Sequence, residues 1–237
     1  MNRDQSAGYH QIMRHLIAGI ALLGAAFPAS AQVAVVDEGS FTITQNGTRI
    51  GREEFAIRRT PSPGGDVLVA NATVVYTDRR LSPALQTDAA GAPLRYQVEV
   101  SVVADVQERL QGRVGRGRFS AQLRTPRGES SREYVVADGA LILDDDVFHQ
   151  YYFLARAGRT GTVPVVVPRR NVQLSMRVND EGADLVMIGS SRVAATRYAM
   201  SDPDGGTRRI WVDAQGRVLK VTLEGRGITA TRDDPPR

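Results

Sequence analysis

Apolar and polar residues alternate in short runs along most of the chain. The pattern is clear near the start, where Phe41 and Ile43 alternate with threonines and lead into Asn46-Gly47. A period of two indicates β-strands, and Asn-Gly favours the type I′ turn of a two-residue hairpin because both central positions need positive φ. Gly51 in the second strand predicts a bulge or bend there.

The alternation recurs after every short cluster of turn-forming residues, and it predicts about twelve strands. Beyond the first hairpin, strands are expected at residues 67–76, 96–100, 114–123, 132–136, 141–143, 163–167, 172–178, 184–188, 193–200, 207–212, 217–223 and 227–232. Asp138-Gly139 is expected to make a second two-residue turn, and residues 179–182 to separate two strands. This predicts an all-β fold, an antiparallel meander curled into an open or half barrel, with a two-sheet sandwich as the alternative.

Only residues 144–158 carry a helical pattern. Three aspartates at 144–146 could cap the helix start, and an arginine followed by glycine suits its end. Apolar residues recur at i, i+4 and i+7, namely Val147, Tyr151 and Leu154. We expect a helix over residues 146–157 against the concave face of the sheet, either as a core plug or as a lid.

The first 31 residues predict an export signal. A 12-residue apolar run at 16–27 follows two arginines, and Ala29-Ser30-Ala31 supplies small residues for signal-peptidase cleavage. The run is shorter than the roughly 20 residues of a membrane span, so cleavage is favoured over an uncleaved membrane anchor. The expected domains are a cleaved signal peptide at 1–31, a single β-rich domain at 32–232 and a flexible tail at 233–237. The product is expected in the periplasm of a Gram-negative bacterium, with no integral membrane segment after cleavage.

Composition removes several function classes. The 237-residue chain has no cysteine, which excludes disulfides, thiolate nucleophiles and cysteine-based metal sites. Its formal net charge is +4, and 28 basic against 25 acidic groups, a net of +3, remain without residues 1–31. The densest basic stretch, residues 109–118, has no aromatic residue for stacking on bases. We expect no nucleic-acid partner, and interpret 109–118 as solvated strand faces, with a polyanion or anionic-lipid surface as the alternative.

The residues also give little support for catalysis. His149 is the only histidine after residue 31, and no nucleophile lies near it in sequence. Residues 189–192 lack the second glycine of a nucleophile elbow. The acidic stretches at 144–146 and 202–205 do not match a calcium loop. We therefore expect a non-enzymatic protein with no metal and no cofactor.

Glu53 and Glu54 form the one pair of adjacent glutamates. Neighbouring strand residues point to opposite faces, so the two carboxylates cannot act on one substrate bond. One of them is expected to face inward, where Arg52 or Arg58 could pair with it.

Three segments together resemble a family of exported bacterial β-rich proteins of unknown function. They are residues 47–55 (GTRIGREEF), the central residues 141–154, and residues 210–220 (IWVDAQGRVLK). The family is in turn similar in outline to the periplasmic lipoprotein-localisation factors, whose unclosed barrel holds acyl chains against a helical lid. That outline implies an apolar cavity, and it transfers no ligand-binding residue by motif.

Two functions are compatible with these features. The first is a periplasmic protein that binds or carries a hydrophobic or lipid-like ligand within the curved sheet. The residues expected to contact the ligand are Phe148, His149, Tyr151, Tyr152 and Leu154. The alternative is a structural or assembly factor that acts through a cell-envelope protein partner, using a strand edge or the arginine-rich face around Arg113, Arg116 and Arg118.

Overall fold

The computed structural model describes residues 32–156 and 160–237. They belong to the second of two compact units, residues 1–30 and 31–237. The expected signal peptide therefore lies outside the described residues. Within the described ranges, no helix combines the length and apolar character needed to cross a bilayer.

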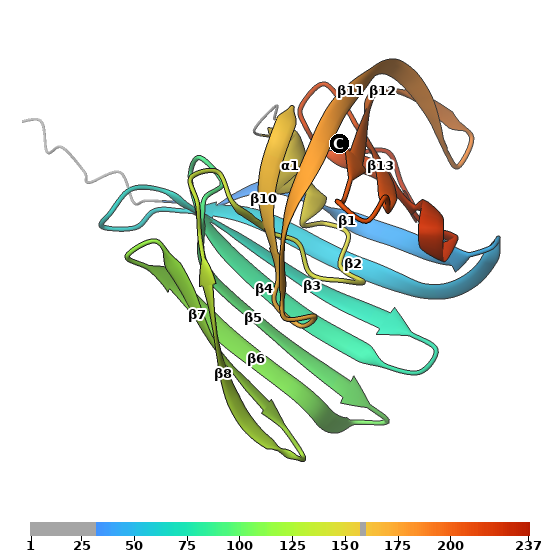
Figure 1. The fold of residues 1–237 in the computed structure, drawn as a ribbon. Coiled ribbons are helices and arrows are strands. Elements are labelled where there is room, and N and C mark those ends of the chain that lie inside the picture. The colour runs from blue at the N-terminus through green and yellow to red at the C-terminus, as the bar shows by residue number, and fades with distance from the viewer. Residues whose placement is uncertain (1–31, 157–159) are drawn as a thin grey trace, which may run out of the picture. The chain divides into compact units, whose positions relative to one another are not determined.

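A single unclosed sheet accounts for most of the described chain (Figure 1). Its strands are β1 (Ala34–Gln45), β2 (Thr48–Thr60), β3 (Val67–Tyr76), β4 (Arg80–Asp88), β5 (Pro93–Val102), β6 (Asp105–Gly115), β7 (Arg118–Thr125), β8 (Gly128–Val135), β9 (Leu141–Ile142), β10 (Gly161–Val167), β11 (Val172–Ile188), β12 (Ser191–Ser201), β13 (Thr207–Val212), β14 (Val218–Leu223) and β15 (Ile228–Arg232). The all-β prediction is confirmed, with fifteen strands in the described residues where about twelve were expected.

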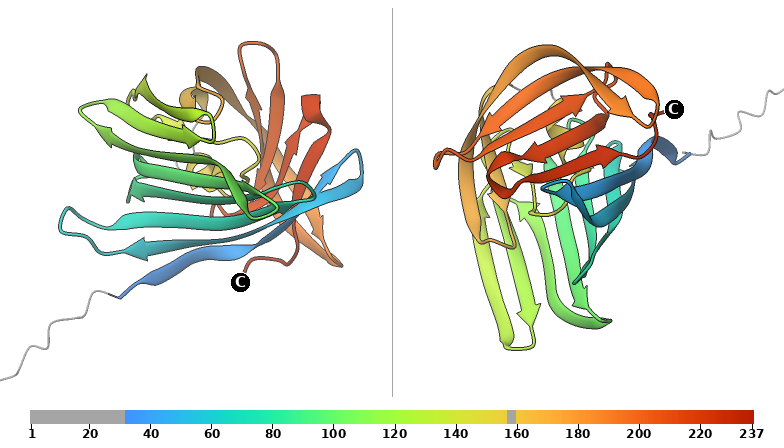
Figure 2. Two further views of the ribbon diagram at one scale, coloured as in Figure 1. Left: turned by 90° about the horizontal axis from the view of Figure 1, so that it is seen from below. Right: turned by 90° about the vertical axis from the view of Figure 1, so that its right-hand side faces the viewer.

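The first and last strands pair at the middle of the sheet. The order is β8-β7-β6-β5-β4-β3-β2-β1-β15-β14-β13-β12-β11-β10-β9, and β1 pairs antiparallel with β15 from Phe41↔Arg232 onward. Two meanders therefore run outward from this junction, and Figure 2 shows them as two curved groups of strands. The last pair, β9 with β10, is parallel, with Leu141 opposite Val165, so the meander is not antiparallel throughout.

The predicted turn at Asn46-Gly47 and the predicted bulge near Gly51 are both confirmed, because the residues at these positions determine the local backbone conformation. Asn46 and Gly47 have φ of 49° and 85°, and they join β1 to β2 with Gln45 opposite Thr48. The register shifts just beyond, where Ile43 faces Gly51 and Thr44 faces Arg49, so the bulge near Gly51 is also confirmed. Strand 67–76 has the expected bounds.

One predicted strand separator, one predicted strand and one predicted hairpin were wrong, because the pairing of strands depends on more than the local residues. Residues 179–182 form a bulge inside the 17-residue β11, because β12 pairs with β11 on both sides of them, from Arg177 to Ile188. The expected strand 114–123 is broken at Arg116-Gly117, both at positive φ. Residues 137–140 do turn, but β8 and β9 on either side lie at opposite ends of the sheet and do not pair.

The one α-helix within residues 32–156 and 160–237 is shorter than expected. α1 spans Tyr151–Arg156, six residues, where the sequence predicts 146–157, and residue 157 lies outside the described ranges. Asp146 has φ of 66°, a left-handed value that interrupts a right-handed helix. No acidic residue lies in the first turn of α1, so the aspartates at 144–146 do not cap it.

The core lies on the inner side of the sheet and includes α1. Inward-facing residues of both meanders form one buried cluster, in which Phe41, Tyr96, Phe119 and Phe148 are among the largest fully buried side chains. A smaller separate cluster joins the β11–β12 hairpin to Trp211 and Leu219.

Side chains, rather than a backbone ladder, connect β8 to the other meander. The Tyr134 hydroxyl shares its single proton between the Pro168 carbonyl (3.2 Å) and Oδ1 of Asn171 (3.0 Å), and Arg132 donates to Pro168 (2.6 Å). Nε2 of Gln173 also donates to the Val135 carbonyl. The sheet ends therefore approach here without strand pairing in the described part of the chain.

Candidate functional site

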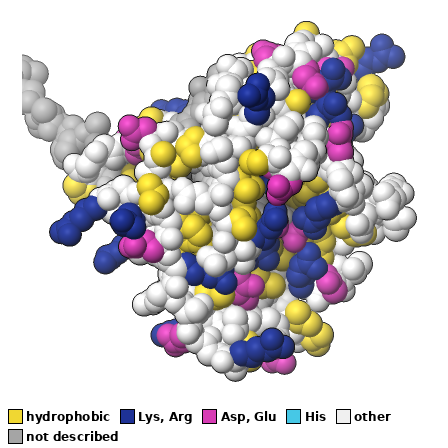
Figure 3. Space-filling view, in the orientation of Figure 1, with side chains coloured by type: hydrophobic (Ala, Val, Ile, Leu, Met, Phe, Trp, Pro, Cys, Tyr) yellow, Lys and Arg dark blue, Asp and Glu magenta, His cyan; other side chains and the backbone are white. Residues whose placement is uncertain are grey.

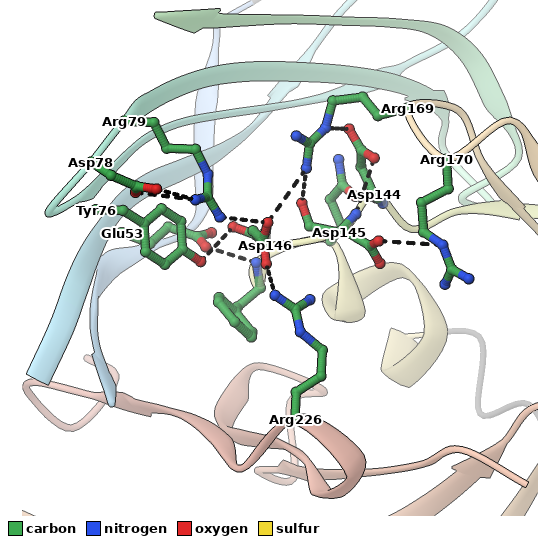
Figure 4. A network of polar contacts seen from close by, with 12 residues as sticks. Glu53, Tyr76, Asp78, Arg79, Asp144, Asp145, Asp146, Arg169, Arg170 and Arg226 are labelled. Carbon is green, nitrogen blue, oxygen red and sulfur yellow. Dashed lines mark hydrogen bonds and ion pairs between the residues drawn. The ribbon is translucent and has the colours of Figure 1, made fainter. Parts of the chain in front are cut away.

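Residues 144–150, here called the acidic loop, hold four of the nine buried polar or charged residues in the described parts of the chain, namely Asp144, Asp146, His149 and Gln150. The loop connects β9 to α1 and contacts β2, β3 and β5 on the inner side of the sheet. Turns at the β3–β4 and β10–β11 connections and the 3-10 helix η1 (Glu224–Arg226) supply arginines to it, as Figure 4 shows. Residues far apart in sequence thus meet at this loop.

Glu53 and His149 form the innermost pair. Oε1 of Glu53 lies 2.6 Å from Nδ1 of His149, and both side chains are fully buried. The same carboxylate accepts the backbone N–H groups of Phe148 (2.7 Å) and His149 (2.8 Å). The Phe55 ring stacks on the imidazole at 5.8 Å. Glu53 therefore fixes the backbone of the loop as well as the imidazole.

The adjacent glutamates behave as the alternation predicts, but the expected partner was wrong. Glu53 faces inward, and Glu54 faces outward with 68% of its side chain exposed. Arg52 pairs with the outward Glu54 (3.3 Å) and not with Glu53. The histidine partner is 96 residues away along the chain, beyond what local pattern can indicate.

Asp144 anchors the start of the acidic loop. Its Oδ2 accepts from the Tyr96 hydroxyl (2.7 Å) and from Nε of Arg169 (2.7 Å). Burial raises the pKa of Asp144, and the Arg169 charge opposes part of that rise. Burial also raises the pKa of Tyr96, with the Asp144 charge adding to it, so the phenol stays a hydrogen-bond donor. The backbone N–H of Asp144 donates to Gln150 (2.7 Å), which ties the two ends of the loop together.

Asp146 is held by guanidinium groups from opposite sides (Figure 4). Arg226 lies 2.7 Å from Oδ1, and Arg79 lies 3.0 Å from Oδ2. Arg169 approaches Oδ2 at 3.8 Å. The Tyr76 hydroxyl donates to the Asp146 carbonyl (3.1 Å), and burial raises the pKa of Tyr76 well above its usual range. The left-handed backbone at Asp146 is therefore fixed through both its side chain and its carbonyl.

This arrangement can hold the loop in place, and it offers little for acid–base catalysis. Nε2 of His149 is buried and has no hydrogen-bond partner among the described residues, so no substrate reaches it in this conformation. No group of three histidine, aspartate or glutamate side chains within residues 32–156 and 160–237 could hold a metal ion.

The structure brings together the five residues predicted to contact a ligand, as part of the core. Their exposed fractions are 1% for Phe148, 1% for His149, 4% for Tyr151, 2% for Tyr152 and 3% for Leu154. The Tyr151 hydroxyl accepts from Arg208 (3.1 Å), and the Tyr152 hydroxyl accepts from Arg156 (3.0 Å). Five open hollows of about 460–590 Å³ lie on the surface, and these side chains line none of them.

The sequence pattern did not indicate the residues that fix the acidic loop, namely Tyr76, Arg79, Tyr96, Arg169 and Arg226. Each stands on a different strand, turn or helix, so no spacing in the sequence could have revealed them. It also gave too short a length for β8, the eight-residue strand at one end of the sheet. Figure 3 shows basic and acidic side chains mixed over the visible face, in agreement with the small net charge.

Comparison with known proteins identifies the fold. Residues 122–232 match the family model DUF6134, a domain of unknown function. The crystal structure of a beta-barrel-like protein of the domain of unknown function DUF1849 from Brucella abortus is similar at 10% identity and a TM-score of 0.53, covering 86% of this chain and 96% of that chain. A DUF1089 family protein from Pseudomonas aeruginosa gives 16% identity and a TM-score of 0.37, covering 87% of this chain and 95% of that chain. No curated protein matches.

These likenesses confirm the expected resemblance to uncharacterised β-rich proteins with an unclosed barrel. At 10% identity, the similarity to the DUF1849 protein extends to the fold alone.

Proposed function

We propose that this protein is a non-enzymatic, exported factor of the cell envelope that binds an extended segment of a protein partner along the outer edge of β8. The observation that carries the proposal is the unpaired backbone of this strand. β8 spans eight residues, pairs with β7 on one side without a register shift, and has no strand partner on its other side in the described residues. Such an edge can accept an added strand through main-chain hydrogen bonds.

The ladder with β7 shows which groups are free. Val136 N donates to the Gly117 carbonyl (2.8 Å), and antiparallel pairs alternate between bonded and non-bonded positions. By this alternation, the N–H and C=O groups of Glu129, Ser131 and Glu133 point away from β7. The Val135 carbonyl, next in the same series, already accepts from Gln173, so the free edge ends there.

The charged side chains of β8 leave this edge open. Glu129 and Glu133 pair across the outer face with arginines of β7, Arg124 at 2.8 Å and Arg118 at 2.9 Å. Both carboxylates therefore lie over β7, and neither covers the free edge of β8. The opposite end of the sheet offers no comparable site, because β9 has two residues whose exposed fractions are 1% and 2%.

A hydrophobic or lipid-like ligand within the curved sheet is the competing proposal. It would have to displace buried core side chains such as Phe148 and Tyr152, and separating the acidic loop from Glu53 would leave that buried carboxyl group without its backbone N–H donors. Co-purification of lipid with protein extracted from the periplasm would favour that reading. The export pattern at residues 1–31 supports an envelope location for either function.

The absence of cysteine makes the edge easy to test. A Ser130→Cys variant carries a unique thiol on β8 for a photo-cross-linker in living cells, and Ser82→Cys on β4, a strand paired on both sides, is the matched control. We expect one dominant cross-linked partner from position 130 and none from position 82. In the Ser130→Cys background, Ser131→Pro should abolish the cross-link, because proline removes an outward N–H, whereas Ser131→Ala should keep it. A cross-link that survives Ser131→Pro contradicts edge binding.

A further inference from the structure

Two arginines stand directly opposite each other on the outer face of the sheet. Arg95 of β5 and Arg113 of β6 are cross-strand partners, and both are exposed. Neither guanidinium makes an ion pair or a hydrogen bond with any described residue. Like charges in directly opposed positions destabilise a sheet, so this pair calls for an explanation other than folding.

Three other arginines of β6 and β7 on the same face are paired with carboxylates. Arg109 pairs with Glu99 (2.5 Å), Arg118 with Glu133 (2.9 Å), and Arg124 with Glu129 (2.8 Å). Their partners are the carboxylates of adjacent strands. Arg95 and Arg113 therefore form a local concentration of unbalanced positive charge beside these paired arginines.

A row of uncharged amides lies beside the two arginines. Gln97, Gln111 and Gln122 are consecutive cross-strand partners on β5, β6 and β7, so their side chains share the outer face. All three are exposed, and none of the three side chains makes a hydrogen bond with a described residue. Each amide offers two donors and one acceptor to a ligand.

The arginines and amides line a single hollow of about 590 Å³ that extends to Ser131 and Glu133 on β8. That volume is within the range of small-ligand sites. Its aromatic and apolar members, Tyr96 and Ala121, are buried, so their side chains point to the inner face. The ligand-accessible surface is therefore polar and cationic.

We propose that this hollow binds an acidic saccharide, with Arg95 and Arg113 on a carboxylate of the sugar and the three glutamines on its hydroxyl groups. Guanidinium groups match carboxylates in geometry and charge, and amides both donate to and accept from hydroxyls. A single-stranded nucleic acid would need aromatic platforms for its bases. A lipid surface or a peptide anchor would need exposed apolar groups, which the accessible lining lacks. The site lies on the outer face and goes beyond the binding of a protein partner at the β8 edge.

The test uses purified protein and labelled hexagalacturonate, with binding followed by fluorescence anisotropy near physiological salt. We expect saturable binding that maltohexaose, a neutral saccharide, does not compete. Polyglutamate carries carboxylates without hydroxyls, and polyphosphate carries a different anion, so both should compete at least about tenfold more weakly. Absence of hexagalacturonate binding, or equal competition by polyglutamate or polyphosphate, overturns the proposal.

Three variants locate the site. Arg113→Gln should weaken hexagalacturonate binding by about tenfold, since a charge-assisted pair is lost. Gln111→Ala should weaken hexagalacturonate binding and leave the weak polyglutamate binding unchanged. Arg109→Gln removes the same charge from the same strand and face, but its arginine is already paired with Glu99, so affinity should be retained. An equal loss in Arg109→Gln and Arg113→Gln would show non-specific charge attraction and overturn the site. The assay contains no protein partner, so its outcome is separate from that of the β8 cross-link.

Discussion

The carboxylate of Glu53 lies 2.6 Å from Nδ1 of His149, and neither side chain is exposed to solvent. The same carboxylate accepts two backbone N–H groups of the acidic loop. Glu53 of β2 therefore orders the segment that connects β9 to α1.

Replacing Glu53 with glutamine should destabilise the fold strongly. The amide can present only one acceptor oxygen to three donors, and its NH₂ group would face buried N–H groups. We expect the free energy of unfolding to fall by about 3 kcal/mol, as for breaking a buried charged hydrogen-bond network. Urea denaturation followed by circular dichroism measures the change. Glu54→Gln, on the exposed side of the same strand, should shift it by less than about 0.5 kcal/mol, and equal effects would argue against the buried role of Glu53.

The sequence indicates features that depend on neighbouring residues, but it does not indicate contacts between residues that are far apart along the chain. Asn46-Gly47 determines its own turn through backbone preferences, and alternation assigns Glu53 and Glu54 to opposite faces. Both are local properties. The partner of Glu53 depends on a histidine 96 residues away, which only the assembled sheet brings near.

The helix prediction failed for the same reason. Three aspartates before an apolar stripe are typical of a helix N-terminus. Here the carboxylates of Asp144 and Asp146 bind Arg169, Arg79 and Arg226, and Asp146 takes a left-handed backbone. The helix can begin only after this anchored loop, at Tyr151. Ion pairs with arginines far away in the sequence thus prevent the helix from starting at these aspartates.

Gly112 of β6 should tolerate no side chain. A Cβ there would lie 2.4 Å from Cζ of Phe119 and 2.9 Å from Cβ of Ala121, both of which are buried. We expect Gly112→Ala to lower the free energy of unfolding by about 2 kcal/mol through overpacking. Gly115→Ala on the same strand meets no atom within 4 Å, so it should be neutral or slightly stabilising. Thermal unfolding of the two variants compares them directly, and matching midpoints would refute the packing argument.

Glu108 should make a pH-dependent contribution to stability. Burial raises its pKa, with Arg169 opposing part of the rise, and Oε1 has no hydrogen-bond partner among the described residues. Native Glu108 is therefore disfavoured as an anion relative to the unfolded chain. We expect Glu108→Gln to be more stable than the parent at pH 7, by less than about 1 kcal/mol because the group is only half buried.

The sign of the pH effect follows from the raised pKa. As the pH falls through the native pKa of Glu108, the parent protein gains a proton and the advantage of Glu108→Gln shrinks. It should vanish below the unfolded value of about 4.3, where both side chains are neutral. Urea titrations across this range measure it. Glu99→Gln, which instead removes the partner of Arg109, should give no stabilisation at pH 7, and an advantage of Glu108→Gln that grows on acidification would contradict the assignment.

Tyr134 should control how firmly β8 is held against the rest of the sheet. Its hydroxyl shares one proton between the Pro168 carbonyl and Oδ1 of Asn171, and these contacts connect β8 to the β10–β11 turn without strand pairing. Tyr134→Phe keeps the ring and removes both bonds, so we expect a loss of about 1 kcal/mol and faster amide hydrogen exchange in β8. Tyr198→Phe, whose hydroxyl makes no hydrogen bond with a described residue, should change neither quantity. In Tyr134→Phe, β8 still pairs with β7, so the effect should stay local to β8. Amide exchange in β1 and β15 should therefore stay unchanged. Uniform acceleration across the whole sheet would mean that Tyr134 supports global stability rather than the position of the β8 edge.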